Sequence, residues 1–236
     1  GSEMCIRDSN EGSQTRRSFI DRLIGQADYI YLQQLIQYQK TLQQRNALLK
    51  QMGRFAQNAQ DTLSIYNEQL VQLGTPIHNA RIAYLTSFEP YFQKRYQTIS
   101  GGNEKVALVY ESQLSDNDFA DLLLAAATKD LQAQFTTVGI HKDDLVFQID
   151  GYPIKKFGSQ GQRKSFLIAL KLAQFDMLKK STAVTPLLLL DDIFDKLDEQ
   201  RVAEIINLVH ESSFGQLFIT DTHPERTADV IKQTKR

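Results

Sequence analysis

The chain has 236 residues, with 27 lysines and arginines against 28 aspartates and glutamates. This balance excludes a strong overall basic field, so any contact with DNA must be local. The single cysteine, Cys5, excludes an internal disulfide framework and a zinc site built from cysteines, and no apolar run reaches the roughly 20 residues of a membrane span. We expect a soluble, cytoplasmic protein of two domains, with no membrane partner.

The first half of the chain has the composition of long helices. Residues 1–10 match no structural element, and we leave them unassigned. From Arg16 to about Ser100 the chain is rich in leucine and glutamine and poor in glycine and proline, which favours helix. Two rows with a seven-residue spacing form an apolar seam: Leu35, Leu42, Leu49, Ala56, Leu63 and Leu70, with Tyr38, Arg45, Met52, Ala59, Tyr66 and Leu73. Gly53 and the step from Gly74 to Pro76 interrupt this seam. We therefore expect residues 11–103 to form an arm of at least two antiparallel helices.

The pattern changes at Ser100-Gly101-Gly102-Asn103, where we place a domain boundary. Residues 104–236 then alternate between strand and helix signals. The predicted strands are 105–110, 145–149, 152–154, 186–190 and 216–220, with Asp150-Gly151 as a tight turn. The predicted helices are 115–134, opened by an N-cap of Ser115 with Asp118, and then 159–180, 202–210 and 224–233. Such alternation predicts an α/β fold with a mainly parallel sheet and covering helices, in which the apolar strand 186–190 is buried on both faces.

The apolar run 187–190 ends in two carboxylates, Asp191 and Asp192. A carboxylate at the carboxyl edge of a parallel sheet lies where α/β proteins bind ligands, and hard oxygens suit Mg²⁺ bound to phosphates. Asp191 would hold the metal through its water shell, and Asp192 would polarise an attacking water. Many strands end in aspartate only as a turn residue, so this pattern alone is weak.

A second motif precedes the first by about thirty residues. Ser159, Gln160, Gly161 and Gln162 open the helix predicted to follow, where backbone amides and a hydroxyl can meet an anion. Taken alone, this is an ordinary helix cap. Followed by a helix and a strand ending in Asp-Asp, it resembles the signature and Walker B segments of an ABC-type ATPase.

Two further segments fit that resemblance. Asp195-Lys196-Leu197-Asp198 resembles the D-loop that lies across the dimer interface of these ATPases, and Asp198 is equally suited to cap the next helix. His223 follows the last predicted strand, where these ATPases place a histidine on the γ-phosphate. An exposed loop histidine would explain His223 as well.

Charged residues outside these motifs are less specific. Arg16, Arg17 and Arg22 lie close together and are candidates for DNA phosphate contacts, although a solvated helix face explains them at least as well. The run His141 to Asp144 places neighbouring residues badly for one metal ion, so a loop held by salt bridges, or one with a conformational role, is the better interpretation.

From Glu11 to Lys232 the sequence resembles the RecF family of DNA replication and repair proteins. The segments that carry the resemblance are 11–13 with 16–21, 44–49, 139–145, and the stretch from the signature to Walker B. The resemblance implies the C-terminal lobe of an ABC-type ATPase head, with a P-loop NTPase-like sheet and an antiparallel helical arm. It further implies ATP and Mg²⁺ as cofactors, and a homodimer on ATP in which residues 159–162 act on the partner's nucleotide. Binding to single-stranded, gapped or junction DNA, other recombination mediators as partners, and a role in the SOS response are implied as well.

The chain departs from the family pattern at Ile140, where proline is usual, and at Asp195, where a small residue is usual. It also contains no Gly-x-x-x-x-Gly-Lys-Ser/Thr loop for phosphates. We therefore expect a fragment without the Walker A lobe, inactive alone although the complete protein is a weak ATPase. Such a fragment would bind ATP weakly and leave apolar sheet surface exposed. Two alternatives remain: an SMC-like ATPase head, for which the arm is short, and a non-enzymatic helical interaction module.

Overall fold

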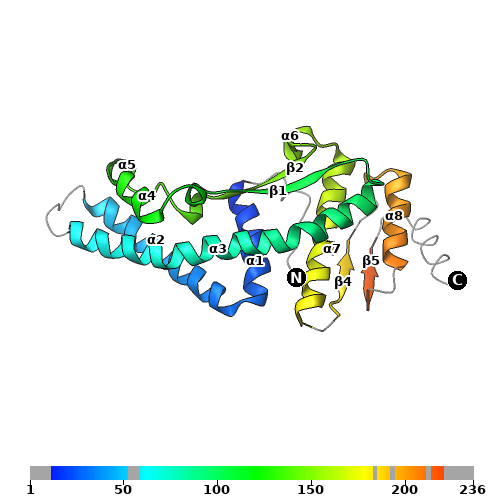
Figure 1. Cartoon of the computed structure of the whole chain (residues 1–236), viewed down its shortest axis with the longest axis horizontal. Helices are drawn as coiled ribbons and strands as arrows, with labels where there is room; N and C mark the ends of the chain where they lie inside the picture. Colours follow the sequence, from blue (N-terminus) through cyan, green and yellow to red (C-terminus); the bar gives the residue numbers. More distant parts are fainter. Residues whose placement is uncertain (1–11, 53–58, 183–184, 192–194, 211–213, 221–236) are drawn as a thin grey trace. The chain divides into compact units, whose positions relative to one another are not determined.

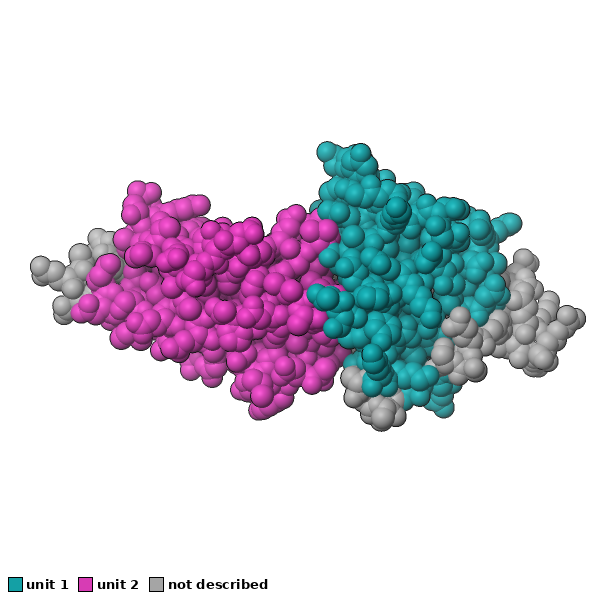
Figure 2. All heavy atoms as spheres, in the orientation of Figure 1, with its two compact units in different colours: residues 1–10, 86–108, 147–236 teal, residues 11–85, 109–146 magenta. Residues whose placement is uncertain are grey.

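In a computed structural model of the chain, the residues described are 12–52, 59–182, 185–191, 195–210 and 214–220. They belong to two compact units that alternate along the sequence (Figure 2). Residues 11–85 and 109–146 form what we call the arm unit, and residues 1–10, 86–108 and 147–236 form the lobe unit. The domain boundary expected near residue 103 stays a prediction.

The arm unit is built on three helices: α1 (Ser13–Ala27), α2 (Tyr29–Met52) and the first part of α3 (Ala59–Ser100). Asp28 separates α1 from α2 in an extended conformation, and its Oδ1 accepts a hydrogen bond from Tyr31 N at 2.9 Å. A side-chain acceptor at this position satisfies an amide that would otherwise lack a partner at the start of α2. The sequence pattern did not reveal this break.

Helices α2 and α3 pack antiparallel, as the seam predicts (Figure 1). Leu49 packs with Leu63 near one end, and Arg45 donates to Asn67 further along. Leu35, Tyr38, Leu49, Leu63 and Leu70 are all buried, which confirms the apolar seam at these positions. The predicted break at Gly53 lies among residues 53–58, outside the described ranges.

The second predicted break is wrong, because α3 continues through Gly74 and Pro76 without interruption. A Cβ atom at Gly74 would lie 2.6 Å from Phe119 Cε1 and 3.1 Å from Tyr38 Cε2. The glycine therefore permits close packing of the helix rather than ending it. Burial of the helix face outweighs the intrinsic cost of glycine and proline in a helix.

The segment predicted as one helix over residues 115–134 begins later and is divided at Ala126 into α4 (Phe119–Ala125) and α5 (Ala127–Ala133). The expected cap of Ser115 with Asp118 is displaced, because Asp118 alone caps α4: its Oδ1 accepts from Ala120 N at 2.8 Å and Asp121 N at 3.2 Å, and Ser115 lies before the helix. Asp130 on α5 forms a fully buried ion pair with Arg45. This tertiary anchor has no signature in the local sequence.

The strands that the structure describes are divided between two small sheets. The first has the order β1 (Val106–Glu111), β2 (Asp144–Ile149) and β3 (Tyr152–Pro153), and β2 pairs antiparallel with β3. The turn between β2 and β3 is formed by Asp150 and Gly151, whose positive φ values of 48° and 80° suit a hairpin turn. Two single-turn 3-10 helices, Gln113–Ser115 and Ile140–Lys142, lie in the arm unit.

The lobe unit contains α6 (Ile154–Phe157), α7 (Gln160–Thr182) and α8 (Glu199–His210). Its sheet consists of β4 (Leu188–Leu190) and β5 (Leu217–Ile219), which pair in parallel with Leu188 opposite Leu217. Phe166 on α7 is fully buried and contacts the rings of Phe92, Tyr96 and Phe147. The α/β class with a helical arm is thus confirmed.

One face of β4 is exposed, contrary to the expectation of burial on both faces. Leu188 and Leu190 are buried, whereas Leu187 and Leu189 are 61% and 71% exposed. Phe218 on β5 is 56% exposed. The predicted final helix, 224–233, lies outside the described residues. Among the helices that the structure describes, none has both the length and the apolarity needed to cross a membrane.

Candidate functional site

The start of α7 is a reciprocally capped turn. Ser159 Oγ accepts a hydrogen bond from Gln162 N at 3.1 Å, and Gln162 Oε1 accepts one from Ser159 N at 2.8 Å. This is the capping-box arrangement, with glutamine in the third position of the helix. Ser159 and Gln160 are exposed, while Gly161 and Gln162 are half-buried. The signature residues thus form an ordered helix N-terminus whose first residues face solvent.

The segment predicted as a D-loop lies against this turn. A Cβ atom at Gly161 would lie 3.3 Å from the carbonyl oxygen of Lys196, so glycine permits the close approach. Asp195 is half-buried, and its carboxylate lies 3.6 Å from the ammonium group of Lys196. The structure therefore brings together two motifs that are separated by more than thirty residues in the sequence.

Asp198 caps α8, as its alternative interpretation predicts. Its Oδ1 accepts from Arg201 N at 2.9 Å, and its Oδ2 accepts from Arg201 Nε at 3.1 Å. Cap and D-loop are compatible functions, because the cap uses the side chain of Asp198 and leaves residues 195–197 in the preceding loop.

Asp191 lies at the carboxyl end of β4, as predicted. It is exposed, and its carboxylate accepts a hydrogen bond from the hydroxyl of Thr220, which follows β5. The parallel pairing of the two strands places these residues at the same edge. The predicted catalytic residues, Asp192 and His223, lie outside the described residues.

The predicted DNA-binding arginines lie on α1 in the arm unit. Arg16 Nε and Nη2 donate to the two carboxylate oxygens of Asp144 at 2.8 and 2.7 Å. Arg17 Nη1 donates to the carbonyl oxygen of Asp143 at 2.5 Å. Arg22 is exposed and donates to the carbonyl oxygen of Ser18. The charge of Arg16 is thus matched by a carboxylate, whereas Arg22 faces solvent.

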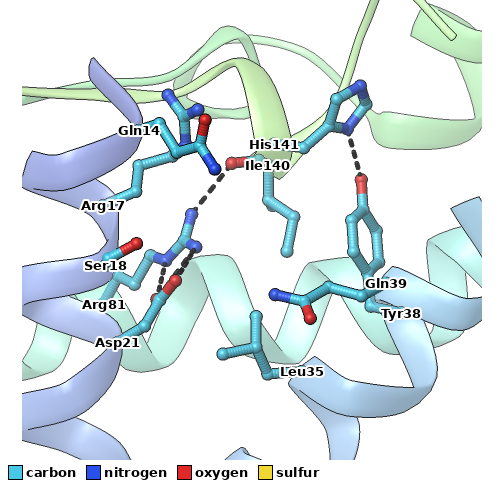
Figure 3. Close-up of a pocket in the computed structure, with 10 residues that line it drawn as sticks. All are labelled: Gln14, Arg17, Ser18, Asp21, Leu35, Tyr38, Gln39, Arg81, Ile140 and His141. Atoms are coloured by element: carbon cyan, nitrogen blue, oxygen red, sulfur yellow. Dashed lines mark hydrogen bonds and ion pairs between the residues drawn. The ribbon is translucent and has the colours of Figure 1, made fainter. Parts of the chain in front are cut away.

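Arg17 lines a pocket of about 170 Å³ in the arm unit (Figure 3). Residues of α1, α2, α3 and the 3-10 helix 140–142 surround it. At its floor, Arg81 donates through Nε and Nη2 to the two oxygens of Asp21 at 3.0 Å each. Since Asp21 pairs with Arg81, the floor of the pocket carries nearly balanced charge.

Arg81 is the centre of a buried network, which we call the Arg81 cluster. It forms ion pairs with Asp21 at 2.9 Å and with Asp143 at 3.0 Å, and its side chain is 2% exposed. Tyr110 donates its hydroxyl to Asp143, and Tyr31 donates to Asp21 at 2.5 Å. Burial alone would lower the pKa of Arg81, but Asp21 and the two tyrosines raise it above its ordinary value. The guanidinium therefore stays charged in the interior.

The run from His141 to Asp144 is a loop held by salt bridges, one of the interpretations preferred from the sequence. Asp143 pairs with Arg81, and Asp144 pairs with Arg16. Burial raises the pKa of Asp143, and this effect exceeds the opposing hydrogen bonds and charges. His141 contacts Tyr38 Oη at 3.0 Å and the carbonyl oxygen of Thr136 at 3.1 Å, and burial lowers the pKa of its imidazole to about 4.

Within the ranges that the structure describes, no group of three or more histidine, cysteine, aspartate or glutamate side chains is arranged to hold a metal ion. Asp191, the residue predicted to bind magnesium, lies within the described ranges and offers one carboxylate. Such a site suits Mg²⁺, which is commonly bound by one or two carboxylates together with phosphates and water.

Sequence reasoning missed the residues that hold these segments in place. Glu104 and Arg201 join the start of α7 to the start of α8, and Arg81 joins α1 and α3 to the loop 140–144. Arg81 had a detectable signal, because it is a charge on the apolar face of a long helix pattern. Glu104 had none, since it is a single acidic residue in a loop.

The chain is similar to curated proteins and to solved structures, although no protein-family model matches it. Over 224 residues it is 58% identical to a protein of Flavobacterium johnsoniae named DNA replication and repair protein RecF, and the match covers 95% of this chain and 62% of that protein. A protein of the same name from Phocaeicola vulgatus is 45% identical over 226 residues, with 95% and 60% covered. The chain thus spans about three fifths of the length of these relatives.

Solved structures of two kinds are similar to the chain. A structure described as the recombination mediator protein RecF with ATP in the RecFOR pathway superimposes with a TM-score of 0.82 at 30% identity, covering 95% of this chain and 62% of that one. An Smc head domain with an extended coiled coil from Pyrococcus furiosus gives a TM-score of 0.53 at 16% identity, covering 95% and 54%. The second likeness shows a common fold only.

Proposed function

The chain belongs to the RecF family of DNA replication and repair proteins, and we propose that it supplies the signature half of an ATP site in a head-to-tail dimer. In this proposal residues 159–162 contact a nucleotide held by a second subunit, so that ATP joins the two. The complete protein is then a weak ATPase of the cytoplasm. It binds DNA during recombinational repair and the SOS response.

The observation that carries the proposal is the capped turn at the start of α7. Ser159 and Gln160 are exposed at the N-terminus of a helix of 23 residues. The first amides of a helix lack partners within it, and the helix dipole adds partial positive charge there, which together favour a phosphate. The relative with 30% identity was solved with ATP, which supports the nucleotide as the anion.

The hydrolytic part of the proposal rests on the end of β4. Asp191, held by the hydroxyl of Thr220, would bind Mg²⁺ through water, and the ion would neutralise phosphate charge. Asp192 and His223 would polarise the attacking water and contact the γ-phosphate. These two roles come from the family resemblance, since both residues lie outside the described ranges.

The exposed face of the β4–β5 sheet supports the proposal that this chain forms only part of an ATPase head. Parallel sheets are normally covered on both faces, yet Leu187, Leu189 and Phe218 are all more than half exposed. The 236 residues also contain no phosphate-binding loop with lysine. We propose that a further part of the RecF fold covers this face and supplies that loop.

The proposed DNA partner is single-stranded, gapped or junction DNA, and other recombination mediators are the proposed protein partners. The RecFOR pathway named for the solved relative supports the protein partners, and the relatives' name, DNA replication and repair protein, supports DNA in general. The form of the DNA comes from the family resemblance. Of the three arginines considered, Arg22 is the best placed to meet a phosphate, because it is exposed. Arg16 is already paired with Asp144, and Arg17 lies in the pocket beside Arg81.

The test is Ser159→Arg in the complete RecF protein that contains this chain, with dimerisation on ATP measured by analytical ultracentrifugation. A bulky cation at the capped turn should block contact with the partner's nucleotide, and we expect ATP-driven dimerisation to be lost. Ser64→Arg is the matched control, since it adds the same charge at an exposed serine of α3. Dimerisation that persists in the Ser159 variant would contradict the trans role of the signature.

A further inference from the structure

Glu104 lies in the lobe unit between α3 and β1, and its side chain is 16% exposed. Its carboxylate accepts three hydrogen bonds from three different segments. Tyr96 Oη donates to Oε2 at 2.5 Å, Gln162 Nε2 donates to Oε1 at 3.0 Å, and Arg201 Nη2 donates to Oε1 at 2.6 Å. One carboxylate thus connects the end of α3, the start of α7 and the first turn of α8.

Toward α7, the bond from Gln162 fixes the side chain that caps the signature turn. The two ends of this amide act together: Nε2 donates to Glu104, and Oε1 accepts from Ser159 N. An amide held at one end by a carboxylate presents its oxygen in one orientation, so the cap geometry depends on Glu104.

Toward α8, Arg201 extends the network to the D-loop-like segment. Its Nη1 donates to Ser165 Oγ at 3.0 Å, and its Nε donates to Asp198 Oδ2 at 3.1 Å. Asp198 ends the segment that begins at Asp195, and the carbonyl oxygen of Lys196 in that segment borders Gly161. The rigid fork of arginine suits this bridging role, since it donates in several fixed directions at once.

The charges of the network are stable near neutral pH. Burial by itself would raise the pKa of Glu104, but hydrogen bonds from Tyr96, Gln162 and Arg201 lower it below its ordinary range. Burial would lower the pKa of Arg201, yet its bonds to Tyr96 and Glu104 raise it. Both groups are therefore ionised, and their mutual bond is charge-assisted.

We propose that Glu104 is a positioning residue for the nucleotide: through Gln162 and Arg201 it holds the signature turn and the segment 195–198 in one fixed arrangement. The inference rests on the proposed function, because it assigns Glu104 to the site at which the signature meets a partner's ATP. Glu104 itself touches no nucleotide. Glu104 therefore affects the ATP concentration that dimerisation requires. It does not affect the affinity of its own subunit for the nucleotide which that subunit holds.

The experiment compares Glu104→Ala with Asp176→Ala in the complete protein. Asp176 pairs with Arg95 further along α7 at 2.8 Å, and its side chain is 18% exposed, so it is a matched ion-pair carboxylate away from the turn. We expect Glu104→Ala to raise the ATP concentration for half-maximal dimerisation by about tenfold, because the variant loses all three bonds of the carboxylate, of which the bond from Arg201 is charge-assisted. ATP affinity of the monomer should be unchanged, and Asp176→Ala should leave dimerisation near the wild type.

Two conservative variants keep the test valid if Glu104→Ala folds poorly. Glu104→Gln retains an oxygen acceptor and should weaken dimerisation less than alanine does. Arg201→Lys keeps the charge but cannot reach three acceptors, so it should weaken dimerisation like Glu104→Ala. Hydrogen exchange provides a second measurement, because the amides of Gln162 and Arg201, which lie in different segments, should lose protection together.

The outcomes separate this inference from the proposed function. If Ser159→Arg abolishes dimerisation but Glu104→Ala shifts it no more than Asp176→Ala, the positioning role is contradicted and the trans signature stands. If Ser159→Arg also has no effect, the proposed function fails first. A loss of monomer ATP affinity in Glu104→Ala would overturn the inference as well, since it would show a general structural defect.

Discussion

The Arg81 cluster and the Glu104 network use the same chemistry in different surroundings. In the arm unit, Arg81 and Asp143 are 2% and 1% exposed. In the lobe unit, Arg201 and Glu104 are 12% and 16% exposed, and the network ends at the exposed Ser159. A buried ion pair is costly to break because the remaining charge is left without a partner, whereas a pair nearer the surface is rehydrated at low cost. We infer that the Arg81 cluster maintains the fold and that the Glu104 network positions a surface.

The largest expected effect comes from removing the centre of the Arg81 cluster. Arg81→Ala leaves Asp21 and Asp143 without their guanidinium, and Asp143 is almost completely buried. We expect the free energy of unfolding of the 236-residue chain to fall by about 3 to 5 kcal/mol. Urea denaturation followed by circular dichroism measures this loss.

Two other arginines are the controls for this prediction. Arg22→Ala removes an exposed side chain and should change stability by about 0.5 kcal/mol or less. Arg201→Ala should fall between the two, because its partners are closer to solvent. An Arg81 variant that loses no more stability than the Arg201 variant would remove the basis for distinguishing the two networks.

The sequence predicted local structure and motif order well, and tertiary anchors poorly. The signature turn, the cap at Asp198 and the Asp150-Gly151 turn follow from rules that act over a few residues, and the structure contains all three. The cap predicted from Ser115 with Asp118 is formed three residues further on, by Asp118 alone. Gly74 shows the limit of such rules. It was interpreted as a helix break, but its role is close contact with Phe119, which lies far away in the sequence.

Partners distant in sequence explain the remaining omissions at the candidate site. Glu104 is separated from Gln162 and Arg201 by 58 and 97 positions, and no periodicity links them. The arginines of α1 show the same limit in the opposite direction. Their spacing suggested phosphate contacts, but for Arg16 the structure reveals a carboxylate partner 128 positions away.

Acid should next distinguish His141 of the arm unit from the Glu104 network. Burial lowers the pKa of His141 in the arm unit to about 4, below about 6.5 for an exposed histidine. Between these values the unfolded chain binds more protons than the folded chain, so the stabilisation present above the higher value is lost as the pH falls toward the lower one. We expect His141→Gln to remove part of this dependence, on the order of 2 kcal/mol between about pH 7 and about pH 4.5.

The comparison for the pH prediction is Glu104→Gln. The lowered pKa of Glu104 means that its contribution is present above the ordinary range of a glutamate and is lost only as the pH falls below that range. Unfolding curves of this variant should therefore run parallel to the wild type between about pH 7 and about pH 5. The pKa of His78 is also lowered by burial, so His78 should still contribute to the pH dependence of the free energy of unfolding in the His141 variant. If the free energy of unfolding depended on pH equally in the wild type and in His141→Gln, the contribution assigned to His141 would be contradicted.

The smallest expected effect is at the signature turn itself. Ser159→Ala removes the hydroxyl that accepts from Gln162 N, and loss of such a cap costs about 1 kcal/mol. The loss should appear in hydrogen exchange at the first turn of α7, with little change at the Arg81 cluster, because the turn is exposed and α7 is anchored by its buried face. Ser64→Ala is the control, since it replaces an exposed serine within α3 and should be neutral or slightly stabilising. If Ser159→Ala instead lowered stability as much as Arg81→Ala, the signature turn would be part of the structural core, and its exposed position would no longer indicate a surface kept for a ligand.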